Sequence, residues 1–176
     1  MMKKTLLCTA LVLLGASIAF SQSSEVMSEI IDSEKATCAQ IAYLPALYAN
    51  KITEDDSSNS LGVMPASKDS SSQTKAAFDA LKSEAFFAEG DEADSVATVS
   101  KISFVYMKAL GIKGGLFYTL LPSPRYAFKQ FQSDGILSSK LEPSDFVSGA
   151  KALSIYTSCV KKYSDFNMKA VSMEAD

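Results

Sequence analysis

The chain of 176 residues contains no histidine, and this absence excludes several kinds of active site. Histidine is the base of Ser-His and Cys-His nucleophile pairs and the commonest zinc ligand. The acidic residues Glu54, Asp55 and Asp56 lack the spacing of a calcium-binding loop. We therefore expect no catalytic residue, no metal site and no cofactor.

Arginine is almost as scarce, because Arg125 is the only one in the sequence. The formal net charge is −3. A mildly acidic chain has no electrostatic footprint for nucleic acid and no overall attraction to an anionic membrane surface. Nucleic acid is therefore not an expected partner.

Long apolar runs are absent except at the N-terminus, where the sequence predicts a signal peptide over residues 1–21. Lys3 and Lys4 precede the uncharged run 5–20, and Ala19-Phe20-Ser21 supplies small residues for cleavage before Gln22. An uncleaved anchor is the alternative, but the run is shorter than the roughly 20 residues that span a bilayer. We expect export to the periplasm or cell surface, with no transmembrane span in the mature chain.

Cysteine is rare, and after cleavage only Cys38 and Cys159 remain of the three. In an oxidising compartment two cysteines most simply form one disulfide bond. The alternative is a pair of buried free thiols, since cysteine is a small hydrophobe common in cores. The sequence leaves both open.

A faint internal repeat indicates the architecture. At an offset of 50 residues, Ala77-Phe78 recurs as Ala127-Phe128, Thr98 pairs with Ser148, and Tyr106 with Tyr156. A fixed period is typical of one supersecondary unit used more than once. Apolar residues at helical spacing follow each cap, and Thr37 begins a degenerate third copy. The sequence therefore predicts an all-α fold of two to three tandem helix-loop-helix units, packed as a compact bundle.

The repeats define the expected domain boundaries. We predict a polar N-terminal segment over 22–35, a helical repeat domain over 36–160 and a flexible tail over 161–176. A serine-rich loop is expected over 51–75, before a helix capped by Thr74. Ser123-Pro124 predicts the start of another helix, because proline suits the first helical position.

The linker over 112–121 interrupts the repeat. It contains Gly114-Gly115, which let the backbone bend or approach another surface closely. It is too apolar for a solvated loop, so we expect it to fold back onto the core. Tyr118 and Tyr126 could form an aromatic platform or belong to that core. Arg125 could bind an anionic ligand or hold the linker in place.

The stretches that follow Ala77-Phe78 and Ala127-Phe128, with the helix starts at Thr98 and Ser148, resemble the S-layer homology family. The resemblance implies three modules packed as a spindle that attach secreted proteins to cell-wall polysaccharide. In that family the second helix opens with Thr-Arg-Ala-Glu. Here no copy has the arginine, and Lys101 and Lys151 are the cations left to contact an anionic glycan.

These patterns predict a non-enzymatic binding or scaffolding module of the cell envelope, whose partner is an envelope polysaccharide such as peptidoglycan. The alternative is a protein-interaction subunit of an envelope complex, with 114–126 as its contact surface. Ser148-x-x-Lys151 matches a motif of penicillin-recognising enzymes, but a helix cap explains Ser148 better.

Overall fold

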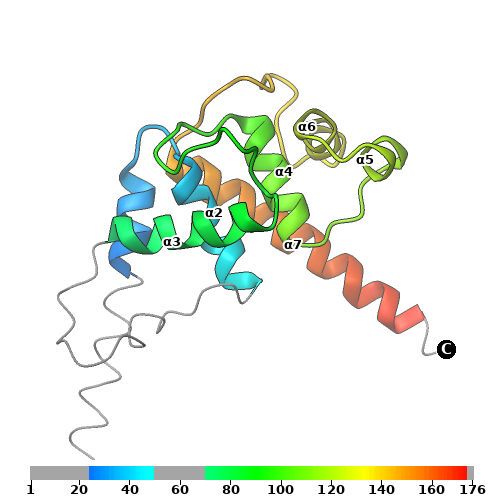
Figure 1. Ribbon diagram of the computed structural model, residues 1–176. Helices are drawn as coiled ribbons and strands as arrows, with labels where there is room; N and C mark the ends of the chain where they lie inside the picture. The colour runs from blue at the N-terminus through cyan, green and yellow to red at the C-terminus, as the bar shows by residue number, and fades with distance from the viewer. Residues whose placement is uncertain (1–23, 50–69, 174–176) are drawn as a thin grey trace, which may run out of the picture.

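The structure is a computed structural model that describes residues 24–49 and 70–173, the last ten of these as backbone only. Within these ranges every regular element is a helix, which confirms the predicted all-α class. The expected signal peptide, residues 51–69 of the serine-rich loop and the acidic residues at 54–56 lie outside them. The helices are residues 24–32, α2 (Cys38–Tyr48), α3 (Ser70–Ser83), α4 (Val99–Ala109), α5 (Leu116–Leu120), α6 (Pro124–Ser133) and α7 (Gly149–Met173) (Figure 1).

Three helices begin with the same capping device, as the sequence predicts. The side chains of Thr37, Thr98 and Ser148 each accept a hydrogen bond from the amide three residues later, at 3.3, 3.4 and 3.3 Å. At Thr37 the Gln40 side chain also accepts from the Thr37 amide at 3.1 Å, which completes a capping box. Each cap satisfies an amide that the helix itself leaves without a partner.

The residues around these caps hydrogen-bond to one another in a closed ring. The first amide of each capped helix donates to a carbonyl in the loop ahead of another capped helix. These bonds run from Cys38 to Ser95 at 2.8 Å, from Val99 to Asp145 at 2.9 Å, and from Gly149 to Ser33 at 3.0 Å. The third bond returns to the loop ahead of Thr37, so the three cap regions are joined in a closed ring.

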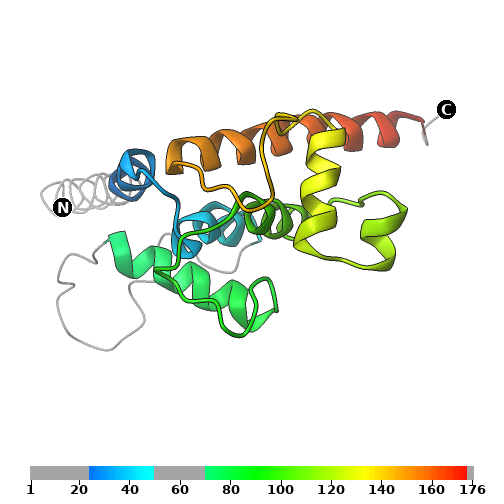
Figure 2. The same ribbon diagram turned by 90° about the horizontal axis from the view of Figure 1, so that it is seen from above.

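The helices pack in the same cyclic order. Helix α2 packs on α3, and α4 packs on α6. The first turn of α7 lies against the helix of residues 24–32, because a Cβ added to Gly149 would lie 1.8 Å from the carbonyl oxygen of Ile30 (Figure 2). Each capped helix, α2, α4 or α7, therefore packs on a helix that precedes another cap.

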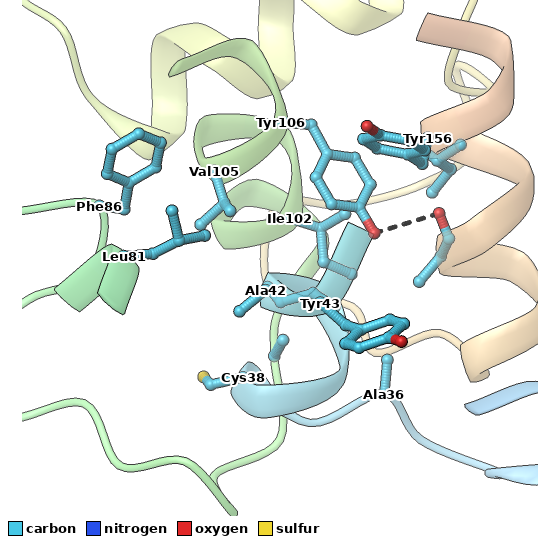
Figure 3. Packing of buried hydrophobic residues seen from close by; sticks show 14 of the residues in the cluster. Ala36, Cys38, Ala42, Tyr43, Leu81, Phe86, Ile102, Val105, Tyr106 and Tyr156 are labelled. Carbon is cyan, nitrogen blue, oxygen red and sulfur yellow. Dashed lines mark hydrogen bonds between the residues drawn. The ribbon is translucent and has the colours of Figure 1, made fainter. Parts of the chain in front are cut away.

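A single hydrophobic core joins the segments, and two tyrosines lie at its middle. Tyr106 from α4 and Tyr156 from α7 meet edge to face, with ring centroids 5.2 Å apart (Figure 3). The buried Tyr106 hydroxyl donates to the Ala152 carbonyl at 3.3 Å. A buried phenol needs such an acceptor, so this bond fixes how α4 crosses α7.

Two expected boundaries at the N-terminal side of the domain are wrong. Residues 24–32 form a helix whose Val26 and Ile30 are only 1% exposed, so the segment belongs to the core. Helix α3 begins at Ser70, and Thr74 lies inside it with its hydroxyl donating to the Ser70 and Ser71 carbonyls. The serine-rich composition concealed the first turn of this helix.

The last helix also extends beyond the predicted domain end, since α7 continues to Met173. Two side chains beyond position 160 bind residue 134 at the end of α6. The Lys162 ammonium donates to the Asp134 carbonyl, and the Tyr163 hydroxyl donates to the Asp134 carboxylate. These contacts hold the helix where polar composition indicated a flexible tail.

Candidate binding site

Helix α6 carries two cations toward one cleft. It begins at Pro124, after Ser123, as the sequence predicts. Arg125 and Lys129 are four residues apart, which places them on one side of a helix, and both are exposed. They line a cleft of about 710 Å³ with residues from α4, α6 and the loop after α6, namely Ser100, Ser123, Pro124, Phe128, Gln132, Ser139, Leu141, Glu142 and Pro143.

The loop that forms the far wall of this cleft is held at both ends. The Gln132 side chain donates to the carbonyls of Ser138 and Leu141, at 3.3 and 3.1 Å. At the other end, the Ser100 amide donates to the Pro143 carbonyl at 3.1 Å. The cleft therefore has fixed walls without a ligand, which reduces the entropy lost on binding.

The positions 50 residues earlier in the sequence differ in their contacts. Lys82, which is 50 residues before Gln132, donates to the Asp91 carbonyl at 2.5 Å. The Asp91 carboxylate in turn pairs with Lys101, with Nζ and Oδ1 2.5 Å apart. Lys82 and Asp91, at the positions 50 residues before Gln132 and Leu141, are therefore bonded to each other, and Asp91 also to Lys101, whereas Gln132 and Leu141 border an open cleft.

Lys101, one of the two expected glycan contacts, is engaged by this ion pair. Its side chain is 23% exposed, and its Nζ also lies 3.9 Å from the Cys38 sulfur. Lys151 is exposed in the first turn of α7. Neither lysine lines the cleft beside Arg125, so the structure does not bring the three predicted cations together.

A second, smaller pocket lies on the other side of α6 and contains the predicted aromatic residues. It has a volume of about 410 Å³ and includes Gly115, Tyr118, Tyr126 and Lys129 in its lining. The ring of Tyr126 stacks on Phe117, with centroids 5.8 Å apart and an interplanar angle of 15°. Lys129 lines both pockets and so connects them.

The Gly114-Gly115 pair positions α5 beside this pocket. A Cβ on Gly114 would lie 2.6 Å from the Tyr118 ring, so only glycine allows that ring to pack here. The Gly115 amide donates to the Gln130 side chain at 2.8 Å. The close approach expected of these glycines is therefore made to Tyr118 and to α6.

The expectation that the linker folds back onto the core is wrong for most of its side chains. Tyr118 is half-buried and packs edge to face on Phe104, with centroids 6.5 Å apart. Ile112, at the start of the segment, is buried in the core at 7% exposure. Four other large apolar residues are 63–71% exposed: Leu116, Phe117, Leu120 and Leu121. Ile112 and Tyr118 make the contact with the core, and most of the apolar side chains of α5 stay exposed.

Cys38 and Cys159 are buried free thiols. Of the two states that the sequence left open, the structure therefore has the free thiols and not the disulfide bond. Cys38 lies beside Lys101, and burial raises its thiol pKa. Burial, and after it the Asp134 charge, raise the pKa of Cys159 to about 12. Thiols kept protonated in this way are poor nucleophiles and suit a packing role.

Ser148 and Lys151 have the role of a cap. The Ser148 hydroxyl accepts from the Lys151 amide and so opens α7. In the described part of the chain, no three metal-ligating side chains cluster and no helix is long and apolar enough to cross a membrane.

Sequence reasoning identified Arg125 but missed Lys129, Ser100 and Gln132. Lys129 could have been found, because the i, i+4 spacing from Arg125 follows from the predicted helix. Ser100 and Gln132 gave no local signal, since they meet only when α4 packs on α6.

Comparison with models of known protein families, with curated proteins and with solved structures found no match.

Proposed function

We propose that this chain is a non-enzymatic binding module of the cell envelope, and that the α6 cleft binds an anionic envelope polymer such as peptidoglycan. One observation carries the proposal: Arg125 and Lys129 line a pre-formed 710 Å³ cleft together with serine hydroxyls. Arginine binds a carboxylate through two parallel hydrogen bonds, and hydroxyls suit the hydroxyl groups of a sugar.

The balance of charge at the cleft favours an anion. Beside Arg125 and Lys129, the lining contains one carboxylate, that of Glu142. The backbone amide of Glu142 donates a hydrogen bond to the Asp145 carboxylate at 2.7 Å. Lys101 is paired with Asp91, and Lys151 lies outside the cleft. In this proposal the cations that contact the anionic glycan are therefore Arg125 and Lys129.

The proposal includes three S-layer-homology-like units in an exported protein. The three equivalent caps and the closed ring of hydrogen bonds between their segments support repeated units. Fold and function are separate questions, and the cleft carries the functional part of the argument.

Sedimentation with purified sacculi tests the proposed function. The wild-type protein is expected to sediment with them, and Arg125→Ala with Lys129→Ala to weaken binding at least about tenfold, through loss of charge-assisted hydrogen bonds. Lys151→Ala is the matched control, because it removes an exposed cation outside the cleft. Absence of wild-type binding, or equal loss in the control, would contradict the proposal.

A further inference from the structure

Helix α5 presents an apolar face that the rest of the described chain leaves uncovered. Leu116, Phe117, Leu120 and Leu121 are 71%, 67%, 67% and 63% exposed. The i, i+1, i+4 spacing of Leu116, Phe117 and Leu120 places these three on one side of α5, and Leu121 follows as the residue that ends the helix. A contiguous exposed apolar patch marks an interaction site more often than scattered apolar residues do.

The structure holds this face outward. Tyr118 lies on the opposite side of α5 and packs on Phe104 of α4. The absence of a side chain at Gly114 admits the Tyr118 ring, and the Gly115 amide binds Gln130 of α6. In both views α5 lies at the periphery, beside α6 (Figures 1 and 2). Tyr118 and Gly115 therefore hold α5 in place, and Phe117, although one face of its ring stacks on Tyr126 of α6, stays 67% exposed beside the three leucines.

The surroundings of this face are cationic, although the whole chain is acidic. The sequence from 95 to 133 has five basic residues and no acidic one, whereas the formal net charge of the chain is −3. Lys113, Arg125 and Lys129 of this stretch are exposed. The lining of the pocket beside α5 includes Lys129 and no carboxylate.

This charge decides between possible occupants. In a symmetric dimer the same surface would face its copy, so the cations of one protomer would oppose those of the other. An anionic lipid surface satisfies both features, because its headgroups attract the cations while the interface accepts leucine and phenylalanine.

We propose that the α5 face docks on the surface of an anionic lipid bilayer, with Leu116, Phe117, Leu120 and Leu121 inserted at the interface. Lys113 and Lys129 lie over the headgroups. This surface contact goes beyond polymer binding in the α6 cleft, and neither depends on the other, although Lys129 borders both.

Flotation with vesicles tests the docking. The probe is phosphatidylethanolamine with phosphatidylglycerol at three to one, beside pure phosphatidylcholine, and all proteins are purified after export so that they share one N-terminus. Wild type should bind the anionic vesicles, and Leu120→Gln with Leu121→Gln should weaken binding at least about tenfold. Lys113→Gln should weaken it less, and the dependence on Lys113 should disappear at about 1 M salt, where the Debye length is about 3 Å.

The fluorescence of an introduced tryptophan reports on membrane contact at one position, because the sequence contains no other tryptophan. Leu120→Trp should shift to shorter emission wavelength on addition of the anionic vesicles. Ile31→Trp is the matched control, since Ile31 is also an exposed aliphatic residue, 49% exposed, on the helix of residues 24–32. Its emission should stay unchanged.

Three outcomes would overturn the docking. The first is that the wild-type protein does not float with the anionic vesicles, and the second is an equal emission shift for Ile31→Trp. The third is that the wild-type protein forms a dimer which the double variant Leu120→Gln with Leu121→Gln converts to a monomer. Loss of vesicle binding without loss of sacculus binding in the leucine variant would support it. Because that variant leaves Arg125 and the α6 cleft intact, failure of the docking and failure of the proposed function can be told apart.

Discussion

Tyr106 and Tyr156 contact each other edge to face, with ring centroids 5.2 Å apart, although they lie 50 residues apart in the sequence. The contact joins α4 and α7 within the core. The closed ring of hydrogen bonds between the cap segments joins the same helices through the backbone.

Replacing the Tyr106 hydroxyl tests its place at the centre of this core. Tyr106→Phe removes a fully buried hydrogen bond to the Ala152 carbonyl and should lower the free energy of unfolding by about 1 kcal/mol. Tyr156→Phe loses a 3.5 Å bond to Leu44 and should cost less. Urea denaturation measures both, and an equal or reversed order would contradict the assignment of Tyr106 to the centre.

Gly149 tests the closure of the ring. Gly149→Ala would place a Cβ 1.8 Å from the Ile30 carbonyl oxygen, so the start of α7 and the helix of 24–32 must separate. We expect a loss of about 3 kcal/mol or more in the free energy of unfolding. Gly90→Ala is the control, because nothing lies within 4 Å of its added Cβ. A neutral Gly149→Ala would show that the two helices do not touch there.

Ala85 has a left-handed backbone conformation, so its replacement by glycine is expected to stabilise the protein. Ala85 has φ of 59°, and Gly135, 50 residues later in the sequence, has φ of 74°. Alanine is strained in this region by roughly 1 kcal/mol or more, whereas glycine is not. Ala85→Gly should therefore raise the melting temperature and Gly135→Ala lower it, as calorimetry would measure. A fall in melting temperature for Ala85→Gly would be inconsistent with the turn.

The buried thiol of Cys159 predicts a loss of stability in alkali. Its pKa rises from 9.0 to about 12 in the fold, mainly through burial. Above about pH 9 the unfolded chain loses this proton while the folded chain keeps it, so stability is complete below pH 9 and falls as pH rises toward 12. Tyr156, with a pKa of about 12, adds to the fall above pH 10.

Denaturation at several pH values measures this dependence. Cys159→Ala should lower stability at pH 7 but reduce its slope between pH 9 and 10, where the tyrosines still keep their protons. An unchanged slope would contradict the burial of that thiol. In the native wild-type protein, both cysteines should also react slowly with a thiol reagent at pH 8.

The sequence allowed the helices and caps to be predicted because these depend on neighbours along the chain. Thr37, Thr98 and Ser148 each bind the amide three residues later. Residues 22–35 were expected to be a polar segment, and the burial of Val26 and Ile30 was not predicted. Gly149, which lies against the Ile30 carbonyl, is far along the chain, so the local sequence does not show that contact.

The site was less predictable than the fold. Arg125 was identified by its rarity, but the cleft needs Ser100, Gln132 and Pro143, which converge only in the folded chain. The apolar residues of α5 indicated burial by composition alone. Composition does not show that Tyr118 suffices to anchor the helix and that Leu120 stays in solvent.

The location of polymer binding is the most direct test of the proposed function. Soluble peptidoglycan fragments are titrated into the isotopically labelled protein, and amide chemical shifts are followed by NMR. We predict the largest shifts at Ser100, Arg125, Lys129 and Gln132 around the α6 cleft. No shifts at all, or shifts centred on Lys151 at the start of α7, would contradict the account.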